Sequence, residues 1–132
     1  MNIRKASLAV FRNGKVLLAR TAKNTEIFYT LGGKIEAGES DLEAIKREVM
    51  EETGTDIDPS SIRFLKEFDA PAHGKPGVTV HIRLYTGNLT GEPVPSREVV
   101  EFRYFDSTIH RRHLTPASVQ IFAWLKAQGY IS

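Results

Sequence analysis

The clearest hydrophobic pattern in the chain lies in residues 33–55, GKIEAGESDLEAIKREVMEETGT. Four apolar or β-branched side chains recur there at spacings of three and four, which predicts one amphipathic helix with a single buried stripe: Leu42, Ile45, Val49 and Thr53. Ser40 followed three residues later by Glu43 is a capping-box pattern for the start of this helix. Gly54 supplies the left-handed residue that commonly follows a helix end.

Apolar-rich and alternating segments on both sides of this helix predict strands. Ala6–Phe11 and Lys15–Arg20 are joined by Asn13-Gly14, which favours a hairpin turn. Further strands are predicted at Ile27–Leu31, Ile62–Phe68, Val78–Tyr85 and Val99–Phe105. Thr115-Pro116 opens a last helix that runs to about Gln128. The order of these elements predicts an α/β fold in which helices flank a mixed sheet.

Length and composition narrow the class of protein. A chain of 132 residues suits one domain, residues 1–132, with one core. Its 18 basic and 16 acidic residues leave a net charge of +2, which gives no argument for binding nucleic acid or a membrane surface. The absence of cysteine excludes disulfides and thiolate chemistry and is compatible with a reducing cytoplasm, the expected location. No sequence feature demands a homodimer, although exposed strands and the last helix could form the interface of one.

The predicted helix carries its acidic residues at the wrong end. Glu48, Glu51 and Glu52 crowd one face of the last two turns, where the helix terminus is itself partly negative. The arrangement costs about 1–3 kcal/mol in total, which calls for a compensating cation. Because Arg47 and Lys46 are expected to point elsewhere, a divalent metal such as Mg²⁺ is the natural candidate. Gly32-Gly33 and Gly38 would let a loop wrap a phosphate-bearing substrate beside this face.

The same residues carry a resemblance to a known family. Their spacing is similar to the Nudix box, in which glycine, glutamate, Arg-Glu, an aliphatic residue, Glu-Glu and a second glycine stand at fixed intervals: Gly33, Glu39, Arg47, Glu48, Val49, Glu51, Glu52 and Gly54. The ninth position, normally aliphatic, is Thr55. Leu31 stands where many relatives have proline, and Phe28 where tryptophan is common. None of these departures touches the expected metal ligands.

The resemblance implies a Nudix-type α/β/α sandwich and a Mg²⁺-dependent hydrolase, with Mn²⁺ as a substitute, that cleaves a phosphoanhydride in a nucleoside diphosphate derivative. Catalytic roles are implied for Glu48, Arg47, Glu51, Glu52 and Glu98, and metal binding for the four glutamates among them. Arg47 would hold the carboxylates in place, and Glu39 would assist through water. Substrate contacts are implied for Arg20, Phe28, Gly32, Gly33, Lys34 and Glu39.

Several assignments stay open on sequence alone. Relatives take the general base either from the box or from a distant loop, where Glu98 is the candidate and Glu101 its rival. Either Phe28 or Tyr29 could stack on a nucleobase, with core packing the stronger expectation for at least one of them. Loop residue His73 is a further substrate-contact candidate. The cluster at residues 110–113 is expected to be a solvated turn rather than a metal site.

The substrate is the least determined feature. In its short length the chain resembles family members that convert (d)NTPs to the monophosphate and pyrophosphate. ADP-ribose hydrolysis is the alternative, because some such relatives carry proline fifteen or sixteen residues beyond the box and Pro71 is sixteen beyond Thr55. A non-catalytic nucleotide-binding Nudix module is the third hypothesis. Retention of all four box glutamates argues against it.

Overall fold

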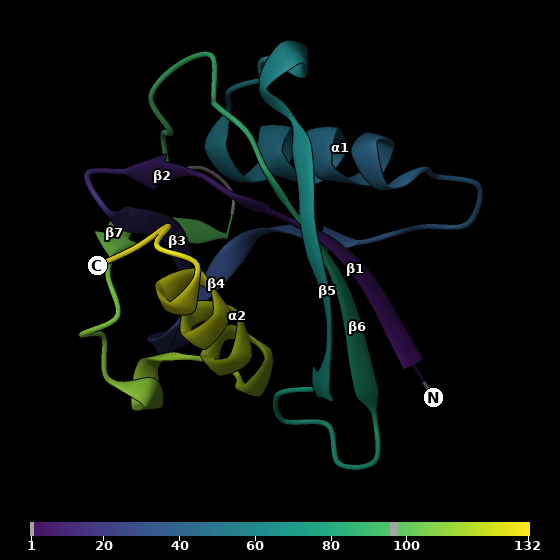
Figure 1. Cartoon of the computed structure of the whole chain (residues 1–132). Coiled ribbons are helices and arrows are strands. Elements are labelled where there is room, and N and C mark those ends of the chain that lie inside the picture. The colour runs from purple at the N-terminus through teal and green to yellow at the C-terminus, as the bar shows by residue number, and fades with distance from the viewer. Residues whose placement is uncertain (1, 96–97) are drawn as a thin grey trace.

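The computed structural model describes residues 2–95 and 98–132, and in that part the chain forms seven strands and two α-helices (Figure 1). The strands are β1 (Asn2–Ala9), β2 (Phe11–Arg12), β3 (Lys15–Thr21), β4 (Asn24–Lys34), β5 (Arg63–Pro71), β6 (Thr79–Thr86) and β7 (Val99–Phe105). The α-helices are α1 (Asp41–Thr53) and α2 (Pro116–Ala127), and two short 3-10 helices cover Pro59–Ser61 and Arg111–His113.

The strands join in one mixed sheet in the order β2-β3-β4-β1-β6-β5, with β7 paired to the free side of β3. Strand β1 is central: it runs antiparallel to β4 and parallel to β6. Each helix covers a different face of this sheet, so the predicted α/β/α arrangement with a mixed sheet is confirmed.

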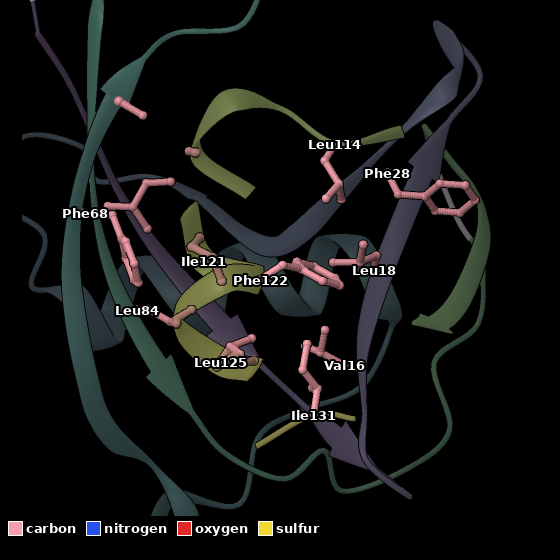
Figure 2. Close-up of a cluster of buried hydrophobic side chains, with 14 of the residues drawn as sticks. Val16, Leu18, Phe28, Phe68, Leu84, Leu114, Ile121, Phe122, Leu125 and Ile131 are labelled. Atoms are coloured by element: carbon pink, nitrogen blue, oxygen red, sulfur yellow. The ribbon is translucent and has the colours of Figure 1, made fainter. Parts of the chain in front are cut away.

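Two hydrophobic clusters lie on the two faces. On one face, Ile121, Phe122 and Leu125 of α2 point between Val16 and Leu18 on one side and strands β5 and β6 on the other (Figure 2). On the other face, α1 packs on β1, β3 and β4 through a second cluster: Ala6, Leu8, Val10, Leu17, Ala19, Leu31, Ile45, Val49, Ile57 and Val99. The long stretch from β1 to β4 therefore contributes to both clusters, because strand side chains alternate between faces.

The turn prediction at Asn13-Gly14 is confirmed, but the hairpin is only partly as expected. Both turn residues have positive φ, 51° and 74°. Only the two-residue β2 pairs with β3, whereas the segment before it leaves the hairpin and pairs with β4 and β6. The chain changes partners because β1 is a central strand that pairs with β4 on one edge and β6 on the other. The local turn signal does not encode this role.

Helix α1 begins and ends as the sequence predicts. The Ser40 side chain accepts from the Glu43 backbone N–H and the Glu43 side chain accepts from Ser40, while Gly54 adopts φ 70°. The buried stripe consists of Ala44, Ile45, Val49 and Thr53, and Leu42 is 43% exposed, which corrects its expected burial. The angle of Leu42 around the helix suits the stripe, so the cause is its place in the first turn, before the stripe begins.

The remaining elements differ from expectation mainly at their ends. Strand β7 has the predicted bounds, whereas β4 is longer than Ile27–Leu31 at both ends because it pairs with β3 through its first half and with β1 through its second. Helix α2 starts after the predicted cap, Thr115, whose side chain accepts from the Ser118 N–H. In the described ranges 2–95 and 98–132, no helix is both long and apolar enough to span a bilayer.

The packing of α1 predicts unequal effects of two truncations on the same helix. Ile45 is fully buried at 0% exposure, so Ile45→Ala should lower the free energy of unfolding by about 2–5 kcal/mol through lost burial and an unfilled cavity. Leu42→Ala, the matched control, should change it by about 0.5 kcal/mol or less. Urea denaturation followed by circular dichroism measures both, and equal losses would contradict the burial pattern.

Candidate active site

The site is built where the glycine turn of β4 meets the last turns of α1. The Gly32 backbone N–H donates to Glu52 Oε1 at 3.0 Å. A Cβ at Gly32 would lie 2.2 Å from the Ala6 carbonyl oxygen, and one at Gly33 would lie 2.5 Å from the Glu48 carboxyl carbon. Glycine is required at position 32, where φ is 113° and a side chain would meet the β1 backbone, whereas a side chain at position 33 would displace the Glu48 carboxylate. The contact holds two carboxylates against the backbone.

Arg47 lies within this acidic cluster and donates hydrogen bonds to two of its carboxylates and to one backbone carbonyl. Its Nε and Nη2 donate to the two carboxylate oxygens of Glu39 at 2.8 and 2.9 Å, and its Nη1 donates to Glu48 Oε1 at 2.9 Å. Nη2 also donates to the Lys34 carbonyl at 3.2 Å. The expectation that Arg47 points away from the acids is therefore wrong: the guanidinium folds back and links the loop before α1 to its carboxylates.

This clamp sets the charge states of its partners. The hydrogen bonds from Arg47 and from the Glu36 backbone lower the pKa of Glu39 to about 2, so Glu39 stays ionised. The same hydrogen bonds, first to Glu39 and then to Glu48, raise the pKa of Arg47. With both oxygens on Arg47, Glu39 is a positioning partner of the guanidinium in this arrangement.

Glu52 is the acid whose charge is least compensated. Burial raises its pKa most, and the negative charges of Glu48 and Glu51 raise it further. The hydrogen bond from Gly32 and the charge of Lys5 oppose these effects, and the resulting pKa is about 8. Arg47 Nη1 lies 3.9 Å from Glu51 Oε1 and does not reach Glu52. A cation beside Glu52 would therefore remove a real electrostatic cost.

The donor set fits a hard divalent cation. Glu48 and Glu52 present carboxylate oxygens beside the Gly32-Gly33 backbone, which suits Mg²⁺ held by one or two carboxylates with substrate phosphates and waters completing its shell. Across residues 2–95 and 98–132, no three acidic or histidine side chains already converge as a metal site. The arrangement thus matches an ion bound jointly with substrate better than a closed structural site.

A cleft of about 370 Å³ opens beside this contact. Gly32, Gly33, Lys34 and Glu52 form part of its wall, and the rest comes from β1, β3, β6, the loop after β5 and the start of α2. This volume lies in the range of small-molecule sites. Lys34 and both glycines therefore lie where substrate contact was predicted.

The two candidate bases outside the helix lie in different surroundings. Glu98 has a side chain 71% exposed and lies 3.7 Å from Lys23 Nζ, and it does not line the cleft. Glu101 accepts from Arg20 at 2.8 Å and also pairs with Arg103, and these contacts lower its pKa. A carboxylate held by two arginines is a poor proton acceptor, so the geometry disfavours Glu101 as the base.

Two expected substrate contacts have other partners. Arg20 is committed to the ion pair with Glu101, on a strand face away from α1. Phe28 is 5% exposed and packs edge-on against Phe105 at 4.8 Å between centroids, so it offers no open ring face to a base. The neighbouring Tyr29 lines the cleft instead. Core packing thus holds for Phe28, and the stacking candidate is Tyr29.

The histidines also differ in whether they line the cleft. His73 lines the cleft, as a substrate contact would require. His113 Nδ1 lies 2.7 Å from the Glu26 carbonyl oxygen, and His110 Nδ1 accepts from the Arg112 N–H. Residues 111–113 form a short 3-10 helix capped by His110, so both His110 and His113 have backbone partners.

Sequence reasoning missed the β1 side of the cleft. Ile3, Lys5 and Ser7 all line it, yet the strand was expected to begin only at Ala6. The signal was present as a period of two: Ile3, Lys5 and Ser7 alternate with the exposed Arg4 and with Ala6, which is buried in the cluster under α1. Lys75, in the loop after β5, also lines the cleft and was not singled out.

Comparison with curated proteins finds a related protein from Bacillus subtilis (strain 168), named "Putative ADP-ribose pyrophosphatase YjhB". It is 38% identical over 73 residues, which cover 55% of this chain and 34% of that protein. The aligned segment thus spans only about a third of the relative.

Solved structures share the fold over nearly the whole chain. The MutT NUDIX hydrolase from Burkholderia pseudomallei aligns with a TM-score of 0.76 at 21% identity, covering 93% of this chain and 97% of that one. The E. coli ORF135 protein aligns with a TM-score of 0.74 at 22% identity, covering 96% and 92%. The model of the NUDIX domain family matches residues 1–125, and the chain therefore belongs to the Nudix hydrolase family.

Proposed function

We propose that the protein hydrolyses nucleoside triphosphates, (d)NTPs, to the monophosphate and pyrophosphate in the presence of Mg²⁺, with Mn²⁺ as a substitute. The observation that carries the proposal is the placement of Glu48 and Glu52 against the Gly32-Gly33 turn, at the wall of a cleft of about 370 Å³. Lysines line the same cleft and complement a phosphate chain. Acidic groups and ammonium groups in one cleft suit a substrate that brings both phosphate and metal.

Each residue of the site has a role in this proposal. Glu48 and Glu52, with Glu51 beside them, would hold the ion, which when bound neutralises phosphate oxygens and lowers the pKa of water. Arg47 keeps Glu48 oriented through its link to Glu39. Lys34 binds phosphate oxygens from the rim. In this proposal a box carboxylate that is not bound to the ion accepts the proton of the attacking water, because the box borders the cleft through Glu52 whereas Glu98 does not line it.

ADP-ribose hydrolysis is the second candidate. It is favoured by the name of the Bacillus subtilis relative and by Pro71, which lines the cleft and stands sixteen residues beyond the box. The match covers 34% of the length of that relative.

A substrate panel with product identification decides between the candidates. Purified protein with Mg²⁺ is incubated with the eight common (d)NTPs and with ADP-ribose, and products are resolved by anion-exchange chromatography. Pyrophosphate released from triphosphates is the expected result. AMP and ribose 5-phosphate as the main products would instead select the second candidate. Binding of nucleotide without hydrolysis of any substrate would favour a non-catalytic module.

Two isosteric substitutions test where the proton goes. Glu52→Gln should lower turnover by roughly 100- to 10,000-fold, because the amide can neither accept the proton nor bind a cation well. Glu98→Gln, at the exposed position beside Lys23, should stay within a few-fold of wild type. Steady-state rates at saturating substrate, with thermal unfolding as a folding control, measure both. A larger loss in Glu98→Gln would move the base to the loop.

A further inference from the structure

Lysines from three separate segments face one another in the cleft. Lys5 on β1 and Lys34 on β4 are directly opposite in the antiparallel pairing of these strands, so their side chains leave the same face. Lys75 reaches the cleft from the loop between β5 and β6. Lys5 is half-buried on the cleft floor, whereas Lys34 and Lys75 are exposed at its mouth. Together these three residues form what we call the lysine triad.

In the described part of the chain, no member of the lysine triad forms a salt bridge. Among residues 2–95 and 98–132, no carboxylate oxygen lies within 4.0 Å of any of its three ammonium groups. Lys23, the other lysine that lines the cleft, does have one in Glu98. Burial lowers the pKa of Lys5 first, the charges of Lys34 and Lys75 lower it further, and the charges of Glu52 and Glu48 oppose this shift without cancelling it. The three groups therefore lie close enough to repel one another.

The position of Lys5 distinguishes it from an ordinary surface lysine. It alternates with the exposed Arg4 along β1 and lies on the inward face with Ile3. Opposite it across the parallel pairing stands Ile82, which is 5% exposed. The charges of Glu52 and Glu48 attract the half-buried Lys5 ammonium, but neither carboxylate forms a salt bridge with it. An anion that enters the cleft can therefore contact this ammonium directly and reduce the repulsion among the three lysines.

We propose that Lys5 and Lys75 act with Lys34 to bind the phosphate chain of the substrate, and that they thereby select nucleoside triphosphates over a nucleoside diphosphate joined to an uncharged sugar. This inference rests on the proposed function and adds its specificity-determining residues. A triphosphate ends in a terminal phosphate that carries about −1.5 to −2 charges near pH 7, whereas a diphosphate sugar has only bridging phosphates. Three ammonium groups complement the additional terminal charge.

The test uses charge-removing and charge-keeping variants of one position. Lys5→Met keeps the length and apolar stem, and Lys5→Arg keeps the charge. Lys5→Met should raise KM about tenfold or more for every triphosphate, whatever its base, with a smaller change for ADP-ribose. Lys5→Arg should recover most of the loss, and Lys66→Met, at an exposed position on β5 outside the cleft, should match wild type. Lys75 lies in a loop, so Lys75→Met should leave the fold intact. This variant should raise KM about threefold to tenfold.

Binding of inorganic pyrophosphate, measured by calorimetry with Mg²⁺, separates this inference from the proposed function. Pyrophosphate affinity should fall at least tenfold in Lys5→Met, even if the wild-type protein hydrolyses no nucleotide. Unchanged pyrophosphate affinity in both Lys5→Met and Lys75→Met would overturn the inference, even if triphosphates are hydrolysed. A loss confined to triphosphates with one base would also overturn it, because Lys5 would then contact the base. An equal loss for ADP-ribose and triphosphates would remove the claim of selectivity.

Discussion

The close approach of α1 to the glycine turn of β4 is the constraint on which the site depends. Gly33 leaves space for the Glu48 carboxylate, and the Gly32 N–H holds Glu52. The other end of the helix is tied to β6, where Arg83 and the Tyr85 hydroxyl both donate to Asp41. Between these ends, fully buried side chains fix the helix on the sheet. These contacts place the acidic face of α1 beside the glycine turn.

The carboxylates of that face and the lysines of the cleft are not all paired with opposite charges. Arg47 supplies one positive charge to two carboxylates, Glu39 and Glu48, and Glu52 keeps a raised pKa in the cleft wall. The lysine triad lines the same cleft, where Glu52 and Glu48 attract Lys5 without forming a salt bridge with it. Charges held apart in this way stabilise each other less than they would in direct contact. Their separation within one cleft suits a ligand that is anionic and that also brings a cation, as a nucleotide with its metal does.

The sequence carried the local features of the site and missed those that depend on distant pairing. The caps of α1, its carboxylates and the glycine turn follow from spacing within about twenty residues. The central position of β1 depends on partners more than twenty residues away, so the inward direction of Lys5 was not evident. The helical angle of Arg47 led to the expectation that it points away from the acids. That expectation fails because the angle fixes where a side chain starts, not where a long side chain ends. The choice between Phe28 and Tyr29 required the register of β4 against β3.

The central claim is that a divalent cation compensates the acid at the end of α1, and a calorimetric titration with Mn²⁺ tests it most directly. Because Glu52 has a pKa of about 8 without metal, it is mostly protonated at pH 6.5 and mostly ionised at pH 9. Wild-type affinity for Mn²⁺ should therefore rise over that range, with proton release on binding near pH 7. Glu52→Gln should bind more weakly and lose most of this pH dependence. Wild-type protein that binds no Mn²⁺ at pH 8, alone or with a non-hydrolysable nucleotide, would contradict the account.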